Sequence, residues 1–541
     1  MSRHRLIALA LAFALVWMGT LGARKLVTPD EGRYAEISRE MALSGDWVTP
    51  RLNGIKYFEK PPLQYWATAA AFRAFGETEF AARLWTGFAG LLAVLATFFT
   101  GRRLFRAEAG LLGAAVCGSS LLFVFMGHFN ALDMGLAGML HLAICGFLLA
   151  QQGSASEGRR WMLAAWAALA LAVLAKGIVA LVLTGGTLVL YSLATRDFSP
   201  WKRLAPVSGT LLFLAVAAPW FVAVSAANPE FARFFFIHEH FERFLTKTHG
   251  RVEPAWYFLP VLAVGFLPWT AAVLHAVLPA SWRRDGDGFQ PRRFLLLWCL
   301  VVLGFFSASG SKLPSYILPM LPALALLAGD ALPRLSNRAL RGHIVLLAVM
   351  ASAALILAPR AAGLDEEIPG AMAAYAKWLT ASAAVLLAAT LAALWLAVRE
   401  RRTGALLLVA GGALIANTGA LLGHDSLSRT QSAYHIALEI KPLLRPDTPF
   451  YSVNMHDQTL PFYLGRTVTL AEYRDEFDFG LRQEPQHAVP TIAEFRRRWH
   501  ADADAFAIMR PDIYAGFAAD PEFELVARDP RRVVVRKRRA S

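Results

Sequence analysis

The feature that most constrains this chain is a series of apolar runs, each about as long as a helix that crosses a lipid bilayer. Of its 541 residues, 56% are hydrophobic, which exceeds the apolar content of an ordinary soluble fold. At about 20 apolar residues per span, we expect about thirteen membrane helices. Their expected ranges are 6–23, 78–100, 108–126, 131–151, 161–175, 178–195, 205–226, 256–280, 294–309, 315–330, 342–358, 375–398 and 404–422. The chain is therefore expected to be an α-helical polytopic membrane protein.

The basic residues predict the orientation of these spans. The formal net charge is +14, but its cations cluster in short segments between the apolar runs, as the positive-inside rule requires, so we exclude nucleic acid as a partner. The clusters fall on one side: Arg3 and Arg5, Arg102-Arg103, Arg159-Arg160, Lys202-Arg203, Arg283-Arg284, Arg292-Arg293, Arg338 with Arg341, and Arg401-Arg402. We expect a cytoplasmic N-terminus in the inner membrane of a Gram-negative cell. An odd number of spans then places loops 24–77 and 227–255 and the C-terminal region in the periplasm.

Two further patterns limit the possibilities. The first apolar run resembles a signal peptide, but it is long and lacks a convincing small-x-small cleavage site, so we predict an uncleaved first helix. Cys117, Cys145 and Cys299 all lie inside apolar runs without a CxxC pattern, which supports neither a disulfide framework nor a zinc–thiolate site.

The composition changes near residue 430, where the apolar runs shorten and Pro, Asp and Arg return. We therefore predict a membrane domain at 1–428 and a small soluble periplasmic α/β domain at 429–541. Its expected strands are Phe450–Val453, Thr467–Leu470, Phe506–Met509 and Arg532–Val535, with a helix at Thr491–Trp499. It contains no glycine-rich phosphate loop or nucleophile elbow.

The polar stretch from Thr28 to Pro62, inside the first outer loop, is the best candidate for an active site. It mixes cations with carboxylates, and basic residues in an exported loop run against the positive-inside rule unless they serve a purpose. The pattern indicates chemistry on an anionic substrate. Tyr34, Ile37 and Met41 predict an amphipathic helix over Glu31–Leu43, lying in the membrane interface. Pro61-Pro62 favour the start of a second helix that continues through Ala74.

Each candidate residue in this stretch has a structural alternative. Asp30 and Glu31 follow Thr28-Pro29, where Asp30 would cap the first interfacial helix and the helix dipole would favour Glu31. The functional alternative is a carboxylate that supports glycosyl transfer, and both roles can coexist. The run from Tyr57 to Pro62 is either an aromatic anchor with a snorkelling lysine, or an anion-binding Lys60 beside a metal-capable Glu59.

Other candidates lie at the same outer face. Asp133 begins a span and is either a helix cap or a functional acid. Lys176 and Lys312 end other spans as snorkelling residues or as parts of a phosphate site. His238 and His240 in the loop 227–255 form an HxH pattern, which is a weak indication of a divalent metal. The alternative is that the aromatic and basic residues of this loop cover a polyprenyl chain and its phosphate.

Four segments together carry a resemblance to a known family: Thr28–Tyr34, Gly45–Pro50, Tyr57–Pro62 and His238–Arg251. The chain resembles the bacterial branch of the protein O-mannosyltransferase-like, superfamily C (GT-C) glycosyltransferases, most closely the aminoarabinose transferases that modify lipid A. The resemblance covers the whole membrane region and is weakest in the C-terminal domain. It implies transfer of a sugar from a polyprenyl (undecaprenyl) phosphate carrier at the periplasmic face.

The resemblance also assigns roles to residues. It implies Asp30 as the principal catalytic carboxylate with Arg33 as its neighbour, Asp133 as a second acidic site, and Tyr57 and Lys60 as contacts to the donor phosphate. Beyond these, we expect Glu31 as a further catalytic candidate and contacts to the donor phosphate or substrate from Arg33, Lys176, Arg243, Lys312 and Tyr316. The resemblance further implies a divalent metal, zinc by donor chemistry and chiefly structural, bound by Glu59 and His240 with His238 nearby.

Two alternatives remain open on the sequence. A related transferase with a protein or other glycan acceptor would share these motifs. A lipid transporter or flippase would carry ionisable residues near mid-span and internal repeats, whereas here most charges lie at the outer rim and we find no repeat. We expect a monomer that binds the bilayer, the lipid-linked donor and a cell-envelope acceptor such as lipid A.

Overall fold

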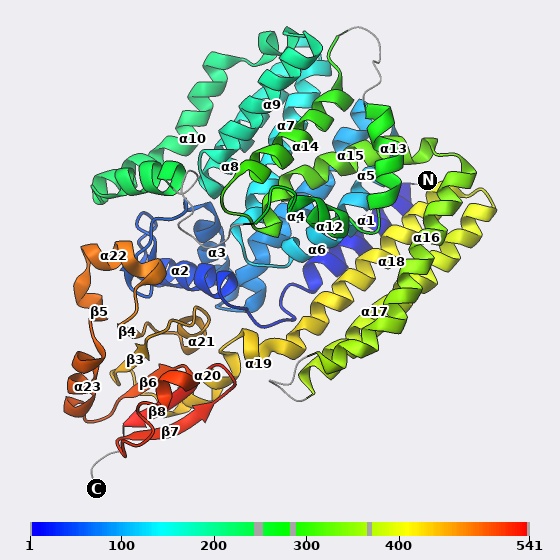
Figure 1. Cartoon of the computed structure of the whole chain (residues 1–541). Coiled ribbons are helices and arrows are strands. Elements are labelled where there is room, and N and C mark those ends of the chain that lie inside the picture. Colours follow the sequence, from blue (N-terminus) through cyan, green and yellow to red (C-terminus); the bar gives the residue numbers. More distant parts are fainter. Residues whose placement is uncertain (1–2, 243–252, 282–287, 365–369, 538–541) are drawn as a thin grey trace.

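The computed structural model describes residues 3–242, 253–281, 288–364 and 370–537. It has a helical membrane part and a smaller mixed α/β domain at the C-terminal end (Figure 1). The helices of the membrane part are α1 (Arg3–Gly19), α4 (Glu79–Leu104), α5 (Ala107–Ser119), α6 (Leu121–Gly127), α7 (Leu132–Gln152), α8 (Ala155–Lys176), α9 (Val179–Thr195), α10 (Pro206–Ala227), α12 (Phe258–Gly265), α13 (Thr270–Ser281), α14 (Pro291–Ala308), α15 (Leu321–Ala331), α16 (Asn337–Leu357), α17 (Ala371–Val398) and α18 (Arg402–Gly423). A π-helical segment covers Arg233–Glu242, and a 3-10 segment, Pro314–Met320, precedes α15.

The number of spans differs from the expected thirteen. Among the described residues, nine helices are long and apolar enough to cross a membrane, or ten if α5 and α6, which meet at a bend of 67°, form one span. Besides this bent pair, three expected spans do not contain a helix long enough to cross a membrane by this criterion. α1 and α9 have 17 residues each, and the run 256–280 is divided into α12 and α13. Apolar length alone does not reveal where Pro268 and Ser120 interrupt a run.

The centre of the membrane part is formed by α7 and by the segment Pro314–Arg334, whose apolar windows are each 94% buried. Small residues allow the surrounding helices to approach closely. A Cβ added at Gly329 would lie 2.2 Å from the carbonyl oxygen of Ala109, so α15 and α5 touch backbone to backbone. A rigid bundle of this kind can hold polar residues in fixed positions at its end.

The prediction for the segment between α1 and α4 is partly confirmed. It contains α2 (Asp30–Ser44) and α3 (Leu63–Phe75), close to the two expected helices. Between them lies a hairpin of β1 (Arg51–Leu52) and β2 (Ile55–Lys56), which the sequence analysis did not predict. Its turn residues Asn53 and Gly54 both have positive φ, 55° and 79°, and Asn-Gly is the usual signal for such a turn.

The surroundings of α2 differ from those of a surface helix. α2 is buried along most of its length between the membrane helices and the C-terminal domain (Figure 1), and its place at the membrane interface stays a prediction. Its charges tolerate burial because they are paired: Glu36 accepts two hydrogen bonds from Arg39, at 2.6 and 2.7 Å. The charged residues between the apolar positions of α2 therefore do not form a solvent-exposed face of this helix.

The C-terminal domain contains a six-stranded sheet of order β5-β4-β3-β6-β8-β7. β3, β4, β5 and β6 are parallel, and β8 and β7 add an antiparallel edge. The strands are β3 (Phe450–Val453), β4 (Thr469–Ala471), β5 (Ala488–Val489), β6 (Phe506–Met509), β7 (Phe523–Arg528) and β8 (Val533–Lys537), and the helices are α19 (Ser428–Gln431), α20 (Tyr434–Ile440), α21 (Leu460–Leu464), α22 (Asp478–Gln483), α23 (Ile492–Ala501) and α24 (Pro511–Tyr514). The α/β prediction is confirmed.

The two domains share packing around the first loop. Tyr34, Leu52 and Tyr57 from this loop belong to one apolar cluster with Leu470 and Phe477 of the C-terminal domain. A Cβ added at Gly32 of α2 would lie 2.5 Å from the backbone oxygen of Gln458, so only glycine allows this close approach. The loop is therefore a folded layer between the two domains.

Candidate active site

Asp30 begins α2, and its carboxylate lies at a partly open position. The residue before it, Pro29, occupies the capping position of α2 without a side-chain hydrogen bond, so the structure does not support the capping alternative for Asp30. Arg33 Nη1 donates to Asp30 Oδ1 at 2.9 Å, and the Asp30 side chain keeps 33% exposure. An accessible carboxylate next to a fixed guanidinium is suited to meeting a charged substrate.

Arg33 joins the two domains electrostatically. Its Nε donates to Oε2 of Glu476, from the C-terminal domain, at 2.5 Å, and the guanidinium is largely buried. Burial raises the pKa of Glu476 above its usual value, although the charge of Arg33 opposes this. Sequence reasoning missed Glu476, because nothing in its local sequence shows that it docks beside α2.

Glu31 lies in a different environment from Asp30, its neighbour. Its carboxylate is fully buried and accepts hydrogen bonds from Arg83 at 2.6 and 2.8 Å. The backbone N–H groups of Val27 and Asn130 also donate to it. Burial alone would raise the pKa of Glu31, but the charge and hydrogen bonds of Arg83 outweigh burial and lower it. These contacts give Glu31 the role of a structural anchor between α2 and the membrane helices.

Buried tyrosines surround the Asp30–Arg33 pair. Burial, together with the charge of Glu59, raises the pKa of Tyr57 well above its usual value, so its phenol stays neutral. Burial and the charge of Asp30 do the same for Tyr34. Among the described residues, the Tyr57 hydroxyl has no hydrogen-bond partner. A neutral phenol in that position can donate a hydrogen bond to an anionic ligand.

Asp133 and Lys176 lie together, as their shared outer face predicted. Lys176 Nζ donates to Asp133 Oδ1 at 2.5 Å and lies 4.7 Å from the centre of the Tyr316 ring. The charge of Asp30 also acts on Lys176, which links this group to α2. The three residues predicted from different spans thus form one cluster near Asp30.

The remaining cations are held by backbone oxygens. Lys60 Nζ donates to the carbonyl of Glu59 at 2.8 Å, with the Glu59 carboxylate 3.8 Å away. Lys312 is buried, and its Nζ donates to the carbonyl of Ser309 at 2.6 Å. Both ammonium groups are therefore fixed in position before a ligand arrives.

The predicted metal site is only partly covered by the structure. Glu59 is described, and its charge acts on Tyr57 and Glu476. The backbone of His238 and His240 lies in the π-helical segment, but their side chains, like the whole of Arg243, lie outside the described residues. Within the described ranges, no group of three metal-ligating side chains comes together.

Comparison with known proteins covers both domains. A family model for dolichyl-phosphate-mannose-protein mannosyltransferases matches residues 3–235, and a model for the aminoarabinose transferase C-terminal domain matches residues 436–537. The crystal structure of ArnT from Cupriavidus metallidurans bound to undecaprenyl phosphate superimposes with a TM-score of 0.94 at 40% identity, over 99% of this chain and 98% of ArnT. The chain belongs to the aminoarabinose transferase family.

Curated members of the family support this membership. An undecaprenyl phosphate-alpha-4-amino-4-deoxy-L-arabinose arabinosyl transferase of Pseudomonas aeruginosa is 38% identical over 66% of each chain. A second one, from Pseudomonas fluorescens, is 36% identical over 61% of this chain and 57% of its own length. The chain thus matches about three fifths to two thirds of the length of these curated relatives. An oligosaccharyltransferase from Archaeoglobus fulgidus, at a TM-score of 0.53 and 12% identity, shares the fold alone.

Proposed function

We propose that this chain transfers 4-amino-4-deoxy-L-arabinose from undecaprenyl phosphate to a phosphate of lipid A at the periplasmic face of the inner membrane. The observation that carries the proposal is the accessible Asp30 carboxylate, fixed by Arg33 in a layer between the membrane helices and the C-terminal domain. Membership in the aminoarabinose transferase family, over nearly the full length of ArnT, supports the choice of donor and sugar.

The reaction exchanges one bond at the anomeric carbon. The bond from this carbon to the phosphate oxygen of the carrier breaks, and undecaprenyl phosphate leaves with the electron pair. An oxygen of the acceptor phosphate supplies the electron pair for the new bond. Positive charge develops on the sugar ring in the transition state, and the Asp30 carboxylate stabilises it.

The cations and the phenol of the site suit the leaving phosphate. Arg33 and Lys60 supply positive charge next to the leaving phosphate, and the neutral Tyr57 hydroxyl donates an additional hydrogen bond to it. Because the acceptor phosphate is already ionised at neutral pH, Asp30 positions charge and does not need to remove a proton. With a hydroxyl acceptor, the same carboxylate would act as a general base.

The second cluster supports the same chemistry from the membrane side. We propose that Lys176, paired with Asp133, balances the negative charge that accumulates when donor and acceptor are both bound. Its position over the Tyr316 ring keeps the ammonium in place. Lys312 is proposed to contribute charge at the same outer face.

The identity of the acceptor can be tested directly with purified protein in proteoliposomes that contain the lipid-linked aminoarabinose. Lipid A is offered in one set and a Ser/Thr-containing polypeptide in another, and transfer is followed by mass spectrometry. We expect modification of lipid A only. Transfer to the polypeptide instead would support the related transferase with a protein acceptor.

We also propose that a divalent ion, zinc by donor chemistry, binds Glu59 together with His240 and His238. The Glu59 carboxylate is partly exposed and lies within the charged cluster, which fits an oxygen ligand. The ion would supply positive charge that holds the two outer loops together. An anomalous-scattering map at the zinc edge tests this site: a peak at Glu59 that disappears in Glu59→Gln is expected, and no peak in the wild type excludes it.

A further inference from the structure

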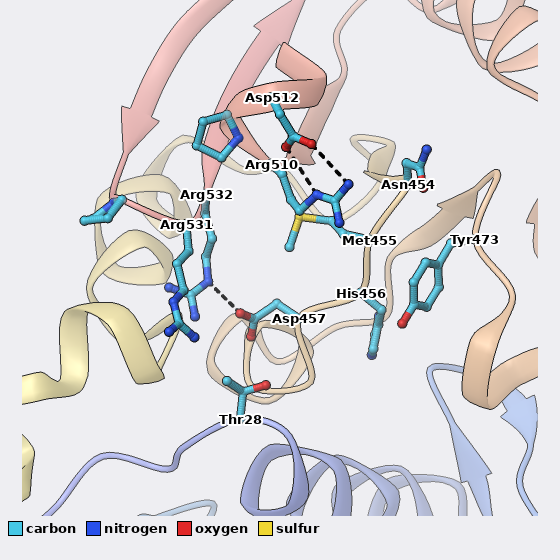
Figure 2. Close-up of a pocket in the computed structure, with 12 residues that line it drawn as sticks. Thr28, Asn454, Met455, His456, Asp457, Tyr473, Arg510, Asp512, Arg531 and Arg532 are labelled. Atoms are coloured by element: carbon cyan, nitrogen blue, oxygen red, sulfur yellow. Dashed lines mark hydrogen bonds and ion pairs between the residues drawn. The ribbon is translucent and has the colours of Figure 1, made fainter. Parts of the chain in front are cut away.

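A cavity of about 440 Å³ lies in the C-terminal domain beside the start of α2 (Figure 2). None of the residues that the sequence analysis predicted as site residues lines it. The lining residues come from the segments that follow β3, β4 and β6, from the segment before β8, and from Thr28. Those with titratable side chains that the argument uses are His456, Asp457, Arg510, Asp512, Arg531 and Arg532.

The cavity lies where an open α/β sheet of this topology binds ligands. From β3, the chain passes to β4 and β5 on one side, and β6 then pairs with β3 on the other side. The connections therefore diverge at the carboxyl ends of β3 and β6, which is the switch point where such sheets bind small molecules. The segments 454–457 and 510–512 follow these two strands and line the cavity from both sides.

His456 faces this cavity with polar atoms that the described residues do not satisfy. The residue is only 7% exposed, and neither ring nitrogen has a hydrogen-bond partner in the part of the chain that the structure describes. Burial lowers the pKa of His456 to about 4, so at neutral pH the ring offers one donor and one acceptor. A sugar hydroxyl, which both donates and accepts, matches this pair. Leaving the ring unsatisfied costs free energy that a ligand would recover.

The three arginines that line the cavity differ in their ion pairs. Arg532 is bound to Asp457 at 2.5 Å, and Arg510 is bound to Asp512 at 3.2 Å (Figure 2). Arg531 is exposed and, within the described ranges, forms no ion pair. Asp529, next to the lining, also accepts a hydrogen bond from Arg532 Nη1 at 2.9 Å, so Arg532 is shared between two carboxylates. The Arg531 guanidinium is therefore the lining cation that is available to an anionic group.

A chain of hydrogen bonds connects the cavity with the candidate active site. Thr28 Oγ1 donates to Gln458 Oε1 at 2.7 Å, and Gln458 Nε2 donates to Glu476 Oε1 at 2.7 Å. Glu476 in turn accepts the hydrogen bond from Arg33. The charge of Arg33 also acts on His456. A ligand in the cavity would therefore contact the same network that positions Asp30.

We propose that this cavity binds a phosphorylated sugar, with Arg531 contacting the phosphate and His456 a sugar hydroxyl, and that the ligand is the sugar phosphate of the acceptor. The identity of the ligand rests on the proposed function. The donor also carries a sugar and a phosphate, but the donor-phosphate candidates Lys60 and Lys176 do not line the cavity. The C-terminal domain would then select the acceptor, and α2 would carry the chemistry.

The test is binding of glucosamine 1-phosphate to the purified full-length protein, measured by calorimetry. Arg531→Gln removes the unpaired charge, and its matched control, Arg528→Gln, removes an exposed arginine of β7 outside the cavity. Loss of one charge-assisted contact is expected to weaken binding roughly tenfold in Arg531→Gln and not in the control. His456→Phe should weaken it as well. Glucosamine and inorganic phosphate should each bind less tightly than the combined probe.

Three results would overturn the proposal: no binding of the probe to the wild type, equal binding in Arg531→Gln and the control, or inorganic phosphate binding as tightly as glucosamine 1-phosphate. Affinity for undecaprenyl phosphate, measured in parallel, separates the two sources of sugar phosphate. It should stay unchanged in Arg531→Gln if the cavity serves the acceptor, and its loss would assign the cavity to the donor. Because these measurements need no turnover, they remain informative even if lipid A is not modified.

Discussion

Asp30 and Glu31 are neighbours in the chain but face different surroundings. Asp30 is partly exposed and bound to Arg33, whereas Glu31 is enclosed and bound to Arg83. The sequence places both carboxylates after Thr28-Pro29 and cannot distinguish them, because the partner of Glu31 lies 52 residues away in α4. Tertiary packing therefore separates a partly exposed carboxylate from a fully buried one.

Replacing Asp30 by asparagine is expected to abolish most transfer while the protein stays folded. The substitution keeps the size of the side chain but removes the charge that, in the proposed function, stabilises the developing positive sugar carbon. We expect a loss of roughly 10²–10³-fold in kcat. The matched control is Asp46→Asn in the same segment, where the side chain accepts hydrogen bonds from Val48 and Thr49. If Asp30→Asn is as active as Asp46→Asn, Asp30 is not a catalytic residue.

Replacing Glu31 by glutamine is expected to lower stability. It leaves the buried Arg83 without its counter-charge, at a cost of roughly 3–5 kcal/mol in the free energy of unfolding. Thermal unfolding in detergent measures this loss at pH 7. A variant that is as stable as the wild type but inactive would instead support the catalytic role that the sequence predicted.

The same carboxylate makes stability depend on pH. Because the pKa of Glu31 is lower in the folded protein than in the unfolded chain, its ion pair stabilises the fold above the unfolded value of about 4.3. This contribution is lost as pH falls through the lower, folded pKa. The difference in stability between wild type and Glu31→Gln should therefore shrink below about pH 4.

At the scale of elements, local sequence patterns predicted the residue ranges of helices and strands better than they predicted which of these elements are buried. The strands β3 and β6 and the helices α2 and α3 lie close to their predicted ranges, because short apolar runs, helical spacing and prolines are local signals. The burial of α2 was not predictable, since it depends on the C-terminal domain closing over it. The missed hairpin had a local signal, Asn53-Gly54, in strands of only two residues each.

The close approach at Gly32 gives a test of this domain contact. Gly32→Ala should force α2 away from the backbone of Gln458 and cost roughly 1–3 kcal/mol, because backbone atoms cannot move aside as a side chain can. Residues 429–541 should then become more sensitive to protease, and transfer should fall. Gly411→Ala in α18, where an added Cβ meets nothing within 4 Å, is the control. Equal protease sensitivity in the two variants would contradict the tight contact.

At the scale of the whole molecule, the membrane class and the two-domain division were predictable from apolar length and composition. The number of spans was not, because helix breaks and bends depend on packing. Orientation stays a prediction from the positive-inside rule. It places the exposed Ala519 in the periplasm and the exposed Ser156 in the cytoplasm.

Single cysteines at these two positions test the orientation in intact cells. The three native cysteines are buried, so background labelling should be low. A membrane-impermeant maleimide that has passed the outer membrane should label Ala519→Cys directly and Ser156→Cys only after the inner membrane is permeabilised. The reverse pattern would invert the topology and place the candidate site on the cytoplasmic side.

Mass spectrometry of lipid A tests the central claim most directly. The chain is expressed in a Gram-negative strain that makes the lipid-linked aminoarabinose but lacks its own transferase, beside Asp30→Asn and an empty vector. We predict lipid A that carries aminoarabinose on phosphate with the wild-type chain alone. Unmodified lipid A in cells that contain the folded wild-type protein and the donor would contradict the proposed function.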